Sequence, residues 1–284
     1  MPSPPRPTVA IVRARAEHVL DDIDRVLELA GLTAWLRVDE PAVLVAAVDS
    51  PFPFPGANST PWQLEGAIRG LQGRGAHPVR CPDEHPVLRA YVIERGAAGA
   101  PVLLPTLKCD AATTINGATR LAAGRRRTFS LMDGTTAGDG PGPRALRPVV
   151  KNVVLASSDP VALDAVAATL MGFEPESIAH LRDAADAGLG VVRVADIDVV
   201  GDAAIAAQRW GFTIGGRVVD RVRERAGSGG LGDLLARGTL AYRDLRWPLR
   251  DRAVFDHWRD ATAWGHLFDR YDSLGALAAT PAGS

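Results

Sequence analysis

Four ionisable residues each follow a short apolar run of the kind that forms a buried strand. They are Asp49, Lys108, Asp133 and Asp159. A carboxylate beside a substrate can accept or return a proton, and a lysine can hold an anionic or carbonyl oxygen. These residue types predict acid/base or electrostatic catalysis on a small anionic or carbonyl-bearing metabolite, as in an isomerase, a lyase or a cyclase.

Lys108 stands out because the chain carries its positive charge almost wholly as arginine. Lys151 is the other lysine in the sequence. A lysine can lose its proton or form an imine, whereas an arginine stays charged. The hypothesis therefore gives catalytic roles to Lys108, Asp133 and Asp159, and it leaves open whether Lys108 is a base, a nucleophile or an anion anchor.

Strands that alternate with helices must position these residues. The expected strands cover residues 8–12, 43–48, 102–107, 129–132, 149–157 and 197–200, and the expected helices cover residues 16–32, 60–73, 160–170 and 176–188. Short connections between them predict an α/β fold, with a mostly parallel sheet and helices on both faces. Because the carboxyl ends of parallel strands share one edge, we expect the four ionisable residues to meet there.

Local signals predict how two of the helices begin. Asp159 precedes a proline and is a typical N-cap, and Thr60 with Gln63 forms a capping-box pattern. Asp133 precedes a glycine, which is typical of a turn. Capping and turn formation are the structural alternatives to catalysis for Asp159 and Asp133.

Further polar residues are candidates for substrate binding. They are Asp49, Asn58, Asn116, Arg144 and Ser157. One alternative function is a magnesium-assisted hydrolase or transferase that uses Asp133, Asp139 and Asp159. Another is a non-catalytic ligand-binding or partner protein.

Composition limits the cofactors and partners that we expect. The chain has 284 residues, is 46% hydrophobic and has a formal net charge of −1, so no general attraction to nucleic acid or to an anionic membrane is expected. No apolar run approaches the roughly 20 residues that span a bilayer, and the opening residues lack a secretory signal, which predicts a cytoplasmic protein. Cys81 and Cys109 form no CxxC pair, which argues against an iron–sulfur centre or structural zinc within one chain. We expect a small-molecule substrate and no cofactor, and we leave a homodimer open.

The amino-acid composition of the sequence changes near residue 218. We expect an α/β core domain over residues 8–217 and an extension over residues 218–284. The extension holds three of the six tryptophans, Trp247, Trp258 and Trp264. Aromatic residues at this density usually bury surface, so the extension is expected to pack on the core, where a lid or a dimer contact is left open as its role.

Three central segments resemble the core of the family catalogued as domain of unknown function 362. They read PTLKCDAATTINGATRLAAG, MDGTTAGDGPGPR and LASSDPVALDAVAATLMGFEPESIAHLRDAADAGLG, while ANSTPWQLEGAIRGL and WRDATAWGHLFDRY resemble one subgroup. The family has no single established activity, so the resemblance implies kinship rather than a reaction. Some members are associated with iron–sulfur modules, and this chain lacks such a cysteine pattern.

The chain also departs from the pattern of that family at several positions. Where relatives tend to read lysine-threonine-histidine, Lys108 matches but Cys109 and Asp110 differ. Arg120 and Leu121 stand where a lysine-asparagine pair is usual, and no lysine lies in the strand that is expected near residues 43–50. These differences imply a specialised member.

Overall fold

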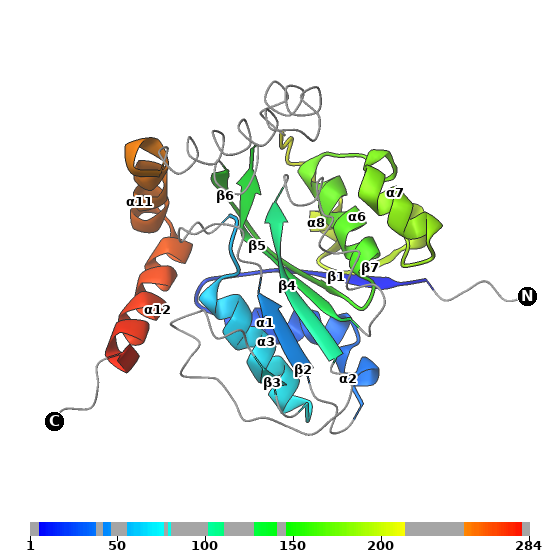
Figure 1. Cartoon of the computed structure of the whole chain (residues 1–284), viewed down its shortest axis with the longest axis horizontal. Helices are drawn as coiled ribbons and strands as arrows, with labels where there is room; N and C mark the ends of the chain where they lie inside the picture. The colour runs from blue at the N-terminus through cyan, green and yellow to red at the C-terminus, as the bar shows by residue number, and fades with distance from the viewer. Residues whose placement is uncertain are drawn as a thin grey trace, which may run out of the picture.

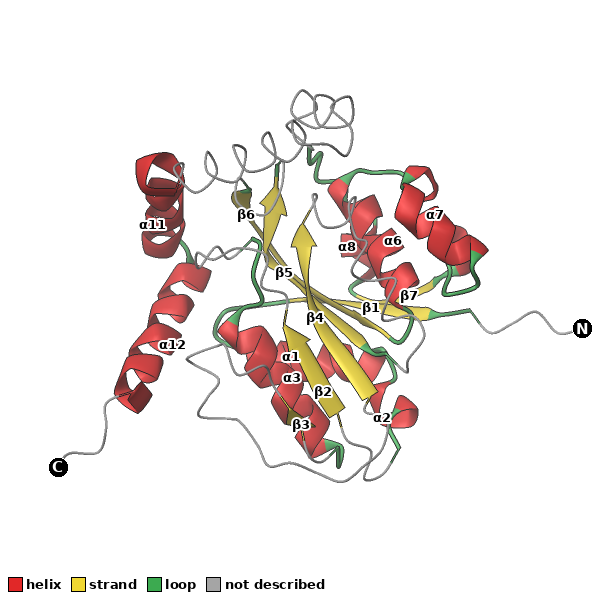
Figure 2. Cartoon of the chain, viewed as in Figure 1, coloured by secondary structure: helices red, strands yellow, loops and turns green. Residues whose placement is uncertain are grey.

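A computed structural model describes eight stretches of the chain, within which a sheet carries helices on both faces (Figures 1 and 2). The stretches are residues 6–37, 42–46, 56–76, 79–80, 102–110, 128–140, 146–213 and 247–279.

The sheet has seven strands in the order β3-β2-β4-β5-β6-β1-β7 within the described residues. They are β1 (Thr8–Arg13), β2 (Ala42–Ala46), β3 (Val79–Arg80), β4 (Val102–Asp110), β5 (Ser130–Asp139), β6 (Arg147–Ser157) and β7 (Asp198–Gly201). Four ladders are parallel, but β6 is antiparallel to both of its neighbours, β5 and β1. The α/β class is confirmed, and the sheet is mixed because the expected common strand direction fails at β6.

The reversal of β6 follows from the length of the connection before it. Seven residues, 140–146, separate Asp139 from Arg147. A parallel crossover needs about a dozen residues or more, whereas a short loop suffices between antiparallel strands. The glycine- and proline-rich connection therefore joins two antiparallel neighbours, which the assumption of one direction missed.

Helices cover both faces of the sheet. They are α1 (Val19–Leu29), α2 (Leu32–Trp35), α3 (Pro61–Gly73), α6 (Pro160–Met171), α7 (Ala179–Asp186), α8 (Ala203–Ala206), α11 (Arg252–Ala261) and α12 (Ala263–Ala279). Side chains of α1, α3, α11 and α12 share one hydrophobic cluster with the sheet, and side chains of α6 and α8 share the other. The prediction of helices on both faces is confirmed.

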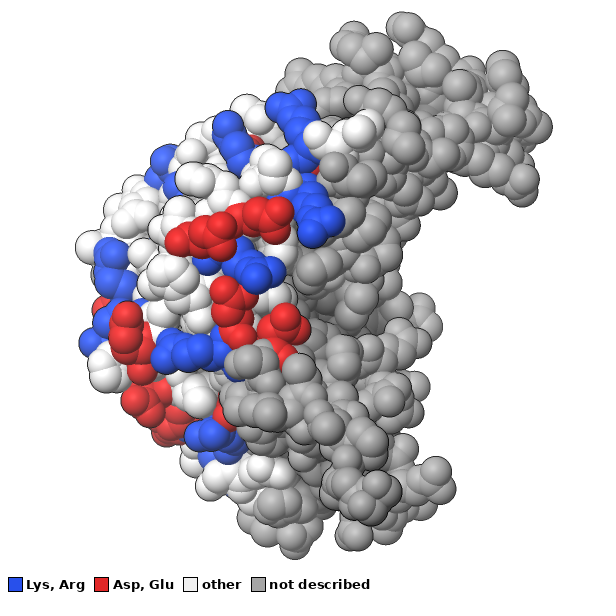
Figure 3. All heavy atoms as spheres, turned by 90° about the vertical axis from the view of Figure 1, so that its left-hand side faces the viewer, with Lys and Arg blue, Asp and Glu red and all other residues white. Residues whose placement is uncertain are grey.

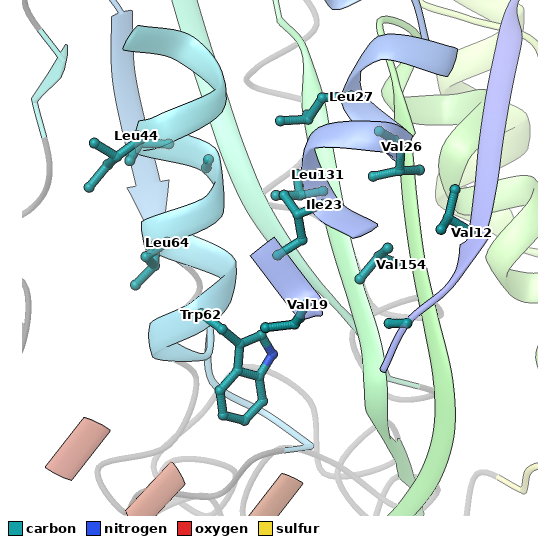
Figure 4. Close-up of a cluster of buried hydrophobic side chains, with 14 of the residues drawn as sticks. Val12, Val19, Ile23, Val26, Leu27, Leu44, Trp62, Leu64, Leu131 and Val154 are labelled. Carbon is teal, nitrogen blue, oxygen red and sulfur yellow. The ribbon is translucent and has the colours of Figure 1, made fainter. Parts of the chain in front are cut away.

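Residues of β1, β5 and β6 alternate between the two clusters, as the two-residue period of a strand requires. Leu131 belongs to the cluster with α1 and α3, whereas its neighbour Met132 belongs to the cluster with α6. Figure 4 shows Ile23 of α1, Leu131 of β5 and Val154 of β6 gathered between the helices and the sheet. This pattern assigns Asp133, two residues beyond Leu131, to the α1–α3 face unless the strand is irregular there.

Two glycines let α3 lie close against α1. A Cβ atom on Gly66 would lie 2.7 Å from the Ile23 side chain, and one on Gly70 would lie 2.5 Å from Leu27. A side chain at Gly66 would push the helices apart, because it would also lie 3.0 Å from the Cβ atom of Ile23, whereas the end of the Leu27 side chain could move aside at Gly70. The close packing fixes α3, and thus Thr60 at its start, against the sheet.

The aromatic residues near the C-terminus are part of the core. Phe255, Trp258, Trp264 and Tyr271 are all less than 9% exposed and belong to the cluster that contains α1 and α3. The predicted domain boundary at residue 218 lies outside the described residues and stays a prediction.

Charged side chains of both signs are interspersed where the described surface is visible in Figure 3. Within the described residues, no helix combines the length and the apolar character needed to cross a bilayer.

Candidate functional site

Asp133 is fully buried in β5, and both of its carboxylate oxygens accept hydrogen bonds. Thr60 Oγ1 donates to Oδ2 over 2.6 Å, and the Thr135 N–H donates to Oδ1 over 2.7 Å. Acceptance at both oxygens is the pattern of an ionised carboxylate. Such a group needs compensation away from water. The start of α3 lies next to Asp133 and carries the positive end of the helix dipole, which supplies part of this compensation for the buried charge.

The register places Lys108 beside Asp133, because the two are paired across the parallel ladder of β4 and β5. Sequence reasoning expected both residues at strand ends, but β4 continues to Asp110 and β5 to Asp139. Two of the three residues to which the hypothesis gives catalytic roles are therefore neighbours inside the sheet. The side chain of Lys108 lies outside the described part of the structure.

The first turn of α3 is built differently from the predicted capping box. Thr60 occupies the N-cap position and Pro61 follows, as expected, but the Thr60 side chain makes no capping hydrogen bond and binds Asp133 instead. The Gln63 side chain donates to the Leu131 carbonyl over 3.1 Å. Both side chains thus attach the helix to β5, and the prediction of a capping box is wrong.

The sheet becomes irregular on both sides of β5 directly beyond Asp133. Toward β4, the register passes from the Lys108–Asp133 pair to an Asp110–Gly138 pair, so one residue of β4 lies opposite four of β5. Toward β6, a further register shift lies between Gly134 and Thr136. Bulges of this kind occur often beside functional sites, where they redirect side chains. The glycine after Asp133 marks this irregularity rather than the end of a strand.

The C-terminal helices reach this region through three aromatic donors. Trp258 Nε1 donates to Thr136 Oγ1 over 3.0 Å, Trp264 Nε1 donates to Asn152 Oδ1 over 2.7 Å, and the Tyr271 hydroxyl donates to Glu65. The Trp264 ring also lies 5.4 Å from the ring of Trp62 in α3, measured between centroids. Together, α11 and α12 cover the sheet near Asp133 with aromatic side chains.

Asp159 does not join Asp133, which corrects the expected meeting of strand ends. Ser157, at the end of β6, pairs with Ser130 at the start of β5, because the two strands are antiparallel. At about 3.3 Å per strand residue, Ser157 is roughly 10 Å from the level of Asp133, and Asp159 follows still farther on. Ser157 itself is buried, donates to the Thr8 carbonyl and accepts from the Asp159 N–H.

Asp159 performs the structural role that was its alternative. It is the N-cap of α6, where Oδ1 accepts from the N–H groups of Val161 and Ala162 while Oδ2 accepts from that of Val191. Burial raises the pKa of Asp159 above its ordinary value, and the three N–H donors oppose this shift. The residue thus joins the start of α6 to the loop at Val191.

Replacing Asp159 by alanine should destabilise the fold without touching the Asp133 region. The change removes a cap and leaves the Val191 N–H without its acceptor, and together these should cost about 2–3 kcal/mol of unfolding free energy. Urea unfolding of Asp159→Ala and wild type measures the difference. A stability equal to wild type would contradict the capping role.

The three carboxylates that the magnesium hypothesis requires, Asp133, Asp139 and Asp159, do not lie together in the structure. Asp139 lies six residues beyond Asp133 along β5, which is roughly 20 Å in a regular strand. It accepts from the Thr213 N–H over 2.8 Å and pairs with Arg147, while Asp159 caps α6. Among the described residues, no three side chains of the kinds His, Cys, Asp and Glu form a cluster that could hold a metal ion.

The remaining candidates divide between described and undescribed positions. Asn58 is half-buried in the segment that leads into α3. That segment contacts β5 closely, since a Cβ atom on Gly56 would lie 3.1 Å from the Cα atom of Gly138. Asp49, Asn116 and Arg144 lie outside the described residues.

Sequence reasoning missed several residues around Asp133. Thr60 was considered only as a cap, and Thr135, Asn152 and Glu65 were not considered. One signal was available, because asparagine is rare within strands and Asn152, together with Lys151, interrupts an apolar run.

Comparison with known proteins gives one match. Residues 110–169 match the model of a family described as Domain of unknown function (DUF362), which confirms the predicted resemblance for this segment. No match was found among curated proteins or solved structures.

Proposed function

We propose, from the premise that residues 110–169 are a segment of the DUF362 family, that the protein is an acid/base enzyme. Its substrate is a small anionic or carbonyl-bearing metabolite, and its reaction is an isomerisation, an elimination or a cyclisation without a redox cofactor. The observation that carries the proposal is a fully buried carboxylate, Asp133, in register with one of the two lysines in the chain.

Asp133 has the role of the proton acceptor. Hydrogen bonds from Thr60 and Thr135 fix the plane of the carboxylate and so orient its oxygens. A proton taken from a carbon next to a carbonyl group leaves negative charge on the carbonyl oxygen. A base at a fixed position typically accelerates such a step by about 10²–10⁴-fold.

Lys108 has the role of the charge that holds this oxygen. A cation close to the developing negative charge stabilises the transition state more than the neutral ground state. The effect is strong where water is excluded, and Asp133, Thr60 and Thr135 are each no more than 2% exposed. The aromatic side chains of α11 and α12 contribute to this exclusion.

The two alternatives are less well supported. The magnesium hypothesis required three carboxylates that lie apart along β5 and at the start of α6. The hypothesis of a non-catalytic binding protein relied on the aromatic C-terminal segment, but Phe255, Trp258 and Trp264 are used in packing against the core.

A comparison of metabolites tests the proposal. Cells with and without the gene are extracted, and the cells that lack it are also complemented with the wild-type chain. We expect one carbonyl-bearing or anionic compound to accumulate without the gene and to disappear on complementation. Purified protein that retains a compound from the extract and forms no product would instead indicate a binding protein.

A further inference from the structure

Asn152 has a backbone conformation that distinguishes it from its neighbours in β6. Its φ is 57°, and it is the one non-glycine residue with a positive φ in the described part of the chain. Asparagine tolerates this left-handed region better than most residues do, but the conformation is still strained. Such strain persists only where surrounding contacts impose it.

The strain arises where β6 has more residues than β5. Between two regular pairs, Gly134 with Val153 and Thr136 with Val150, β5 contains one residue and β6 contains two. Asn152 is one of these two, and its left-handed turn takes up the extra length.

The same bulge determines the hydrogen bond that Thr135 can make. In a regular ladder, the N–H groups of a strand donate to carbonyl groups of its neighbours. At the bulge, the Thr135 N–H donates instead to Asp133 Oδ1 over 2.7 Å. The irregular backbone thus supplies a donor that orients the buried carboxylate.

Asn152 is held in place by two further elements of the fold. Its carbonyl oxygen accepts from the Ala14 N–H over 2.8 Å, and its Oδ1 accepts from Trp264 Nε1 over 2.7 Å. One residue therefore contacts the segment after β1, the helix α12 and the bulge beside Asp133.

We propose that Asn152 is a positioning residue for Asp133. Its left-handed backbone maintains the bulge that directs the Thr135 N–H to the carboxylate, and its side chain attaches α12 over the same region. The consequence for catalysis rests on the proposed function, whereas the geometric effect can be measured without a substrate.

Nuclear magnetic resonance of the full-length ¹⁵N-labelled chain separates the two parts of this role. The observed signals are those of the Thr135 backbone N–H and the Trp264 indole N–H. The indole signal is assigned by its disappearance in Trp264→Phe. Asn152→Gly keeps the left-handed backbone but removes the side-chain acceptor, so it should shift the indole signal and leave the Thr135 signal in place. Asn152→Ala disfavours the backbone conformation too and should shift both signals. The conservative variant Asn152→Asp, which retains an acceptor and tolerates a positive φ, should restore both.

Two results would overturn the proposal. One is a Thr135 signal that stays in place in Asn152→Ala, and the other is a signal that moves as far in Asn152→Gly as in Asn152→Ala. If Asn152→Ala does not fold, the glycine and aspartate variants still test the proposal. Both must leave the Thr135 signal in place, so a Thr135 signal that moves in either of them would overturn it. In complemented cells, Asn152→Ala should clear the accumulated compound more slowly than Asn152→Gly. A failure of Asp133→Asn to affect that clearance would refute the proposed function without altering the magnetic resonance result.

Discussion

Replacing Asp133 by asparagine is expected to slow the clearance of the accumulating compound by a factor of about 10²–10⁴. Asparagine has nearly the same shape as aspartate and retains an oxygen that can accept a hydrogen bond from Thr60 or from Thr135. It cannot accept a proton from the substrate, so the chemical step loses its base while most of the packing remains. The rate is measured in cells that lack the gene and carry equal amounts of each variant.

The matched control is Asp22→Asn on the same face of the sheet. Asp22 is 2% exposed, accepts from the Arg15 N–H over 2.9 Å and pairs with the Arg15 guanidinium over 2.9 Å. Its change therefore also removes a buried, hydrogen-bonded carboxylate, but from a position at α1. We expect Asp22→Asn to lower stability and to clear the compound at a rate close to that of wild type.

Variants of Lys108 provide a second test of the catalytic role predicted for Asp133. If the two residues act as a unit, Lys108→Met and the double variant should each resemble Asp133→Asn, because the effects of cooperating catalytic groups are not additive. Equal clearance by wild type and Asp133→Asn would refute the assignment of the base. An equal loss in Asp133→Asn and in Asp22→Asn would show that lost stability is the cause.

The pairing of Lys108 with Asp133 could be predicted from the sequence because each follows a clear apolar run. Neighbouring parallel strands then place the two residues at the same level. The start of α6 could be predicted for a similarly local reason, since Asp159 and the proline after it specify a cap. Both predictions depend on only a few adjacent residues.

The features that escaped prediction depend on contacts between distant segments. The direction of β6 is a property of the sheet, and its reversal separates Asp159 from Asp133 although each residue was correctly placed near a strand. Thr60 has the sequence pattern of a cap, but a buried carboxylate 73 residues away competes for its hydroxyl group. Asn152 takes its conformation from a register shift that no single strand specifies.

The C-terminal helices give the second large expected effect, because Gly265→Ala should detach α12 from α11. A Cβ atom at Gly265 would lie 2.5 Å from the carbonyl carbon of Arg259 and closer still to its oxygen. These are backbone atoms of the preceding helix, so the clash cannot be relieved by a side-chain rotation. We expect a loss of about 3 kcal/mol, the upper part of the usual range for overpacking.

This loss should be local to the aromatic cover over the sheet. Trp264 and Tyr271 lie on either side of Gly265 in α12, and their hydrogen bonds to Asn152 and Glu65 require α12 to keep its place. Limited proteolysis should therefore cut Gly265→Ala within residues 252–279 while the rest of the sheet stays protected. Gly73→Ala is the control, since a Cβ atom there would meet nothing within 4 Å and alanine favours the helix.

The same variant connects the cover to the proposed chemistry. Gly265→Ala leaves Asp133 and Thr60 unchanged, so slower clearance of the accumulated compound would arise from the loss of the cover and the entry of water, which weakens charge stabilisation. Clearance at the wild-type rate in a variant whose α12 is cleaved would show that catalysis does not need the cover. Proteolysis indistinguishable from that of Gly73→Ala would mean that the corner between α11 and α12 absorbs the extra methyl group.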